Sequence, residues 1–137
     1  MNNKLNLIIF IFRLGFGINF FLHGLTKILG DQIAFQNFIL TKFSSTILPS
    51  FLIKPYAIAV PYIELILGLF LILGLFYYWS LLFCMVTMIS LMIGMILIKD
   101  WQTVSMHLVY LIYLFLLGVN IDNDRICLDN LFKKKGS

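Results

Sequence analysis

The sequence predicts an all-α integral membrane protein, a four-helix bundle with an interfacial segment between its first and second transmembrane helices. Of its 137 residues, 61% are apolar and only 12% are charged, and the mean hydropathy is +1.00. A soluble domain is about 45–50% apolar and about a quarter charged. Four stretches are long and apolar enough to cross a bilayer as helices. We therefore expect residues 1–137 to form a single transmembrane domain in contact with lipid, which excludes a nucleic-acid-binding protein.

Each expected span holds about 20 predominantly apolar residues, the length that crosses the hydrocarbon core of a bilayer. Only Tyr77 and Tyr78 separate the second span from the third, so we expect these two helices to form a tight antiparallel hairpin. These residues, together with Trp79, are typical of the membrane–water interface. The spans cover approximately residues 5–29, 56–76, 79–98 and 104–121.

The connection between the first two spans, residues 30–55, is itself partly apolar. Its Phe35, Phe38, Ile39 and Phe43 follow helical spacing. This spacing predicts a helix that lies in the membrane interface or folds against the bundle.

An even number of spans places both termini on one side of the membrane. Lys and Arg are enriched in cytoplasmic segments, and the terminal side carries the larger number of them. We therefore expect cytoplasmic termini, with residues 122–137 forming a basic tail beside the lipid headgroups. The terminal side holds Lys4, Arg125 and Lys133 to Lys135, and the opposite side holds Lys42, Lys54 and Lys99.

Polar residues interrupt the first span on one face. With Arg13 taken as zero and about 100° of rotation per residue, Asn19, His23 and Lys27 fall at about 240°, 280° and 320°. Such a stripe is expected to face the bundle interior, because ionisable groups are costly in a bilayer and often mark a functional site. In the alternative interpretation, these groups only satisfy one another or the loops.

His23, Glu64 and His107 are predicted to lie at similar depth. Each is a few residues from the end of its span that faces away from the termini, and a helix rises about 1.5 Å per residue. Arg13 lies about 15 Å deeper and belongs to another layer. The same end is capped by Lys27 and by the polar connection Lys99 to Gln102, which includes Trp101.

A carboxylate beside two imidazoles can take up and release protons near neutral pH. Quinone chemistry needs this combination, with hydrogen-bond donors at the two carbonyl oxygens, next to an apolar slot. Tyr110 and Tyr113 follow His107 in the last span and would supply a wall and a hydroxyl. We expect catalytic roles for His23, Glu64, Lys27 and Arg13, and cofactor contacts from His107, Tyr110 and Trp101.

Other interpretations of the same residues stay open. Glu64 could only neutralise Arg13 or Lys27 as a buried ion pair that fixes helix register. Two histidines and a carboxylate can bind a transition metal, and two facing histidines can ligate a haem, but the sequence has no local motif for a metal, haem or flavin.

Three motifs carry a resemblance to a known family. The first span resembles the first-helix signature of the DoxX family of small bacterial membrane proteins, with Arg13-Leu14, Gly17, Phe21, His23-Gly24 and Lys27. The second span is similar to that family's second-helix pattern, with Glu64-Leu65, Gly68, Leu71 and Leu73-Gly74-Leu75. The segment Asp124 to Asp129 is similar to its closing Gly-Arg-x-Ser-Leu-Asp, but Asp124 replaces the Gly and Cys127 replaces the Ser.

The resemblance implies a four-helix membrane bundle associated with redox systems. The family takes its name from a membrane subunit of a thiosulfate:quinone oxidoreductase, and other members are linked to oxidative-stress and thiol complexes. By position, the resemblance implies functional roles for Arg13, His23, Lys27, Glu64, Arg125 and Asp129.

Three functions are compatible with these observations. The leading hypothesis is a quinone-interacting subunit of a redox system in the bacterial inner membrane, which receives electrons from a partner protein. The second is a non-catalytic anchor or assembly subunit of a larger complex, in which Arg13, Glu64 and Asp129 lock the helices. The third is a small lipid or solute carrier, which would require a homo-oligomer because four helices are few for a transporter.

Overall fold

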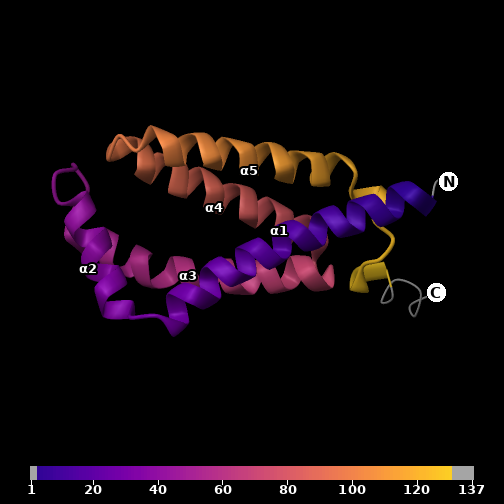
Figure 1. Ribbon diagram of the computed structural model, residues 1–137, viewed down its shortest axis with the longest axis horizontal. Coiled ribbons are helices and arrows are strands. Elements are labelled where there is room, and N and C mark those ends of the chain that lie inside the picture. The colour runs from indigo at the N-terminus through magenta and orange to yellow at the C-terminus, as the bar shows by residue number, and fades with distance from the viewer. Residues whose placement is uncertain (1–2, 131–137) are drawn as a thin grey trace.

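The structure, a computed structural model, describes residues 3–130. These residues form helices and no strand, and four helices are long and apolar enough to cross a membrane. The predicted all-α membrane bundle is confirmed. The helices are α1 (Asn3–Leu29), α2 (Gln32–Phe43), α3 (Ser50–Leu73), α4 (Tyr77–Leu97), α5 (Trp101–Val119) and the short 3₁₀ helix η1 (Ile121–Asn123) (Figure 1).

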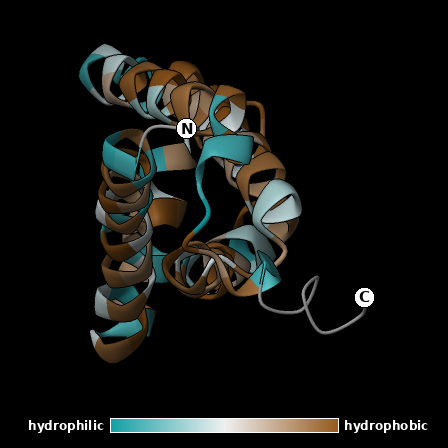
Figure 2. Cartoon of the chain, turned by 90° about the vertical axis from the view of Figure 1, so that its right-hand side faces the viewer, coloured by the Kyte–Doolittle hydropathy of each residue, from teal (hydrophilic) through white to brown (hydrophobic). Residues whose placement is uncertain are grey.

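The four long helices form two pairs. α1 packs along α3, and α4 packs along α5, with fewer contacts between the pairs. The pairs lie close together at the end that carries the start of α1 and diverge towards the end that carries α2 (Figure 1). Most residues of the long helices are hydrophobic (Figure 2), as expected of helices that cross a membrane.

Small residues allow α1 and α3 to approach closely. A Cβ atom added at Gly24 would collide with the Pro61 carbonyl oxygen, and one added at Gly68 would collide with the backbone of Phe21. Membrane helices commonly use glycine for this purpose, since van der Waals contact replaces the hydrophobic effect as the driving force between helices in lipid. The close approach sets side chains of α1 and α3 opposite one another.

The boundaries of α3 and α4 differ from the predicted ones. α3 begins at Ser50, six positions before the expected Tyr56, because the helix continues through Pro55. The turn between α3 and α4 is not Tyr77-Tyr78 but Gly74 to Phe76, and both tyrosines belong to the first turn of α4. Gly74 adopts the left-handed conformation, with φ of 66°, that commonly ends a helix.

The beginning of the expected tail is folded against the bundle. The Asp129 carboxylate accepts hydrogen bonds from the backbone N–H groups of Phe76 and Tyr77, both at 2.8 Å, and caps the start of α4. The Asp129 N–H donates to the Gly74 carbonyl at 3.2 Å. Residues 124–130 therefore cross the α3–α4 turn, whereas Lys133 to Lys135 lie outside the described residues.

Candidate functional site

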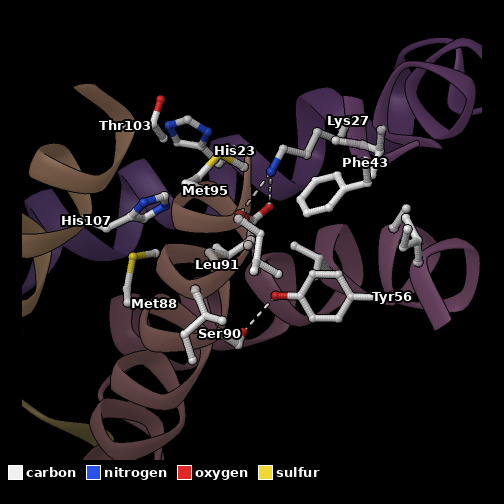
Figure 3. A pocket seen from close by; sticks show the side chains of 18 of the residues that line it. His23, Lys27, Phe43, Tyr56, Met88, Ser90, Leu91, Met95, Thr103 and His107 are labelled. Carbon is white, nitrogen blue, oxygen red and sulfur yellow. Dashed lines mark hydrogen bonds and ion pairs between the residues drawn. The ribbon is translucent and has the colours of Figure 1, made fainter. Parts of the chain in front are cut away.

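A cavity of about 610 Å³ lies between the two helix pairs, at the end covered by α2. All five helices contribute to its walls, which are mostly apolar. This volume is in the range of small-molecule sites, which combine apolar walls with a few polar groups. The polar side chains that line it are Asn19, His23, Lys27, Tyr56, Glu64, Ser90, Thr103, His107 and Tyr110 (Figure 3).

Lys27 and Glu64 form an ion pair on the cavity wall. Lys27 Nζ lies 2.7 Å from Glu64 Oε2 and 3.0 Å from Oε1, so both carboxylate oxygens accept a hydrogen bond. The Glu64 side chain is 4% exposed and that of Lys27 is 25% exposed. Removing a carboxylate from water is costly unless it is paired and hydrogen-bonded, so Lys27 makes the position of Glu64 tolerable. Of the two partners considered for Glu64, the structure selects Lys27.

The two histidines line the same cavity from α1 and α5. His107 is 8% exposed, and its Nδ1 atom has no hydrogen-bond partner among residues 3–130. His23 also lines the cavity and is exposed. The structure thus brings together the expected layer of His23, Glu64 and His107, and adds Lys27 to it.

The aromatic residues expected at the site divide into two groups. Tyr110 lines the cavity and meets Phe16 edge to face. The Tyr113 hydroxyl instead donates to the Phe12 carbonyl at 2.7 Å, and its ring stacks on Phe12. Trp101, the first residue of α5, is 62% exposed and lies outside the cavity lining.

Arg13 does not line this cavity. Its side chain is completely buried, and its Nε donates to Asp124 Oδ2 at 2.7 Å. The guanidinium also donates to the carbonyl oxygens of Leu71, Ile72 and Ile126. Arg13 therefore binds α1 to α3 and to the segment after η1.

Asp124 is the residue that sequence reasoning missed. It is 3% exposed and supplies the countercharge of Arg13. The signal was present, since Asp124 departs from the family motif and a buried arginine requires a carboxylate. Arg125, its neighbour, is exposed.

The two cysteines are buried and separate from the cavity. Cys127 Sγ donates to the Asp124 carbonyl at 3.4 Å. Burial raises the pKa of the Cys127 thiol to about 12, although the nearby Arg13 opposes the shift. Within residues 3–130, no group of His, Cys, Asp or Glu side chains could hold a metal ion.

A sequence model of the DoxX family matches residues 8–95, which is more than half of the chain. The chain belongs to the DoxX family. The match contains Arg13, His23, Lys27 and Glu64, whereas α5 and the Asp124 to Asp129 segment lie beyond it. Searches of curated proteins and of solved structures found no match.

The DoxX assignment and the four apolar helices show a multi-pass membrane protein. The residues of its first-helix motif serve two different sites. Arg13 is enclosed at the end where the helix pairs meet, while His23 and Lys27 face the cavity at the end where the pairs diverge.

Proposed function

We propose that this DoxX-family protein binds a quinone in the cavity between its helix pairs, as a subunit of a redox system in the bacterial inner membrane. The observation that carries the proposal is the Lys27–Glu64 pair on the wall of an otherwise apolar cavity, at 2.7 Å and with Glu64 buried. Ionisable groups that face a cavity within a membrane are typical of ion and proton pathways.

The residues present fit a quinone head. The ring is flat and apolar and suits walls that include Phe16, Phe20 and Tyr110. Its carbonyl oxygens need donors, which the Lys27 ammonium and the imidazole of His107 can supply. A bound quinone takes up two electrons and two protons at these oxygens on reduction.

The chain's own part is to position the ring and to exchange protons. Glu64 and His23 both line the cavity, and we propose that they exchange protons with the bound ring. The electrons are proposed to come from a partner redox protein, since the sequence has no haem, flavin or iron–sulfur motif. We propose cytoplasmic termini, on the basis of the Lys and Arg distribution.

The test is equilibrium binding of a tail-free benzoquinone to the full chain in lipid nanodiscs, with Glu64→Gln as the variant. Gln keeps the shape of Glu but loses the charge-assisted hydrogen bonds that hold the Lys27 ammonium in place. The affinity for the benzoquinone should therefore fall about tenfold. Asp31→Asn is the matched control, because it removes a carboxylate at the same end and Asn still caps α2. The absence of quinone after gentle purification, together with equal affinities of wild type and Glu64→Gln, would contradict the proposal.

A second candidate, a non-catalytic anchor subunit, is favoured by the Arg13 cluster and by the Asp129 cap, which fasten the helices without facing a cavity. It predicts that a stoichiometric partner co-purifies with the chain and that the activity of the complex survives Glu64→Gln. A carrier instead predicts uptake of a ligand into proteoliposomes without any redox change.

A further inference from the structure

The two imidazoles of the cavity lie on one side of it, apart from the hydroxyl groups of Tyr56 and Ser90 (Figure 3). His23 comes from α1, and Thr103 and His107 come from α5, and all three lie on the side opposite Tyr56 and Ser90 (Figure 3). The lining that α3 and α4 add towards α2 is almost entirely apolar and includes Leu52, Ile53, Ile93 and Leu97. A ligand that matches this lining has a polar end and an apolar end.

The apolar side is where α3 and α4 diverge. These helices are joined by the short turn at Gly74 and separate from there towards α2 (Figure 1). Tyr56 on α3 and Ser90 on α4 are connected across the gap by a hydrogen bond of 2.7 Å between their hydroxyl oxygens. This bond limits the gap on the side of the turn.

Beyond this bond, the cavity reaches the outer surface of the bundle. Leu52 and Ile93 line the cavity, yet they are 51% and 53% exposed. On the side of α2, the gap is limited by the buried ring of Phe43, which lies against Gly94. Leu52 and Ile93 therefore border an opening between Tyr56–Ser90 on one side and Phe43 on the other.

This opening lies between two helices that are long and apolar enough to cross a membrane, so we expect it to face lipid. An apolar chain that passes through it can remain among lipid tails while the group attached to it stays in the cavity. Moving such a chain from the protein into the lipid costs little free energy, because lipid tails are as apolar as Leu and Ile side chains. A small polar solute would find no hydrogen-bonding partner among the apolar side chains that border this opening.

We propose that the ligand is an amphiphile with a long apolar tail, whose head contacts the Lys27–Glu64 pair and whose tail leaves between α3 and α4 past Leu52 and Ile93. The inference deepens the proposed function and rests on it only for the chemical nature of the head, a quinone. The Tyr56–Ser90 bond then separates the tail from the narrow part of the gap.

The experiment compares three probes on the full chain in nanodiscs of phosphatidylethanolamine and phosphatidylglycerol. The probes are a tail-free benzoquinone, the same benzoquinone with a decyl chain, and decylphenol. The variant is Ile93→Trp, which fills the opening. The control is Ile89→Trp, one helical turn away on α4, where the side chain is 43% exposed and does not line the cavity.

We expect Ile93→Trp to weaken binding of the decyl-benzoquinone, at equal mole fraction in the lipid, by about tenfold, a loss typical of overpacking. Binding of the tail-free benzoquinone should change less than about twofold in both variants. The control should bind all probes like wild type, and matching thermal unfolding of the two variants would show that both are folded.

The outcomes separate this inference from the proposed function. Equal effects of Ile93→Trp on tailed and tail-free benzoquinone would overturn the tail route and leave quinone binding intact. Binding of decylphenol that depends on Ile93, with no binding of either benzoquinone, would overturn the quinone function and support the amphiphile. Failure of all three probes to bind wild type would overturn both.

A second measurement locates the tail directly. A photoactivatable diazirine at the end of the decylphenol chain should label peptides of α3 and α4 near Leu52 and Ile93 in wild type. Labelling that falls instead on α1 and α5, near Asn19 or Thr103, would contradict the proposed route.

Discussion

The two ends of the bundle each contain a cation of α1 that is paired with a carboxylate, but the two pairs differ in their surroundings. The side chains of Arg13 and Asp124 are both completely buried, and the remaining donors of Arg13 reach backbone carbonyls. Lys27 is a quarter exposed, and its partner Glu64 faces a cavity. Of the two pairs, only Lys27–Glu64 has free space beside it, and it is the pair that we propose contacts a ligand. Where the protein itself satisfies the charge, the charge holds the fold together.

The largest loss of stability is expected at the end where the helix pairs meet around Arg13 and Asp124, which we call the closed end. Arg13→Met leaves the Asp124 carboxylate buried without its partner and should lower the free energy of unfolding by about 3–5 kcal/mol. Arg13→Lys should not rescue it, since an ammonium cannot reproduce the planar fork of donors. Denaturant unfolding in mixed micelles measures the change.

The double variant Arg13→Met/Asp124→Leu is the control for this prediction. It removes both charges and should recover most of the lost stability. A loss below about 1 kcal/mol in Arg13→Met would show that the cluster does not hold the helices together.

Replacing the paired cation by Met at the cavity end should affect ligand binding more than stability. Lys27→Met should cost about 2 kcal/mol of unfolding free energy, less than Arg13→Met, because Glu64 faces a cavity with room for water whereas Asp124 is enclosed by protein. The affinity for a benzoquinone should nevertheless fall about tenfold, through loss of a charged donor. A stability loss as large as that of Arg13→Met would remove the distinction between the two ends.

The cap on α4 should make a smaller contribution. Asp129→Ala removes two hydrogen bonds to backbone N–H groups and a negative charge from a helix N-terminus. We expect a loss of about 1 kcal/mol, measured by the same unfolding titration. Asp129→Asn should retain part of the cap, and equal losses in both variants would indicate that only the charge matters.

The smallest effect concerns thiol reactivity at the closed end. Because burial raises the pKa of Cys127 to about 12, the thiol stays protonated as the pH rises from 7 to 9, and alkylation should remain slow. The matched control is a cysteine introduced by Ser45→Cys at an exposed position in the connection after α2. Maleimide labelling at pH 8 should be fast at position 45 and slow at Cys127, and equal rates would show that the closed end opens readily.

The common depth of the ionisable residues of the cavity could be predicted from the sequence. A helix rises by a constant amount per residue, so counting from the span ends placed His23, Glu64 and His107 at one level, and all three line the cavity. The start of α3 was harder to predict, because Lys54-Pro55 looks like a helix boundary, although the helix begins at Ser50.

The partner of Arg13 could not be predicted from periodicity. Asp124 lies 111 residues away in the sequence and outside every helical pattern. Its position depends on how the segment after η1 folds back across the α3–α4 turn, which is a tertiary event. For Trp101, counting residues gave a suitable depth, but depth alone does not decide whether a side chain faces the cavity. Trp101 is exposed and does not line the cavity.

The Arg13–Asp124 pair has a consequence for how the chain is made. During synthesis, Arg13 is inserted with α1, but Asp124 leaves the ribosome 111 residues later, a delay on the order of ten seconds at about 5–20 residues per second. For that interval, an arginine in the first span has no carboxylate partner from the closed end. Until Asp124 has been made, water or lipid headgroups have to satisfy the Arg13 guanidinium, so the enclosed Arg13–Asp124 cluster forms only after α5 has been synthesised.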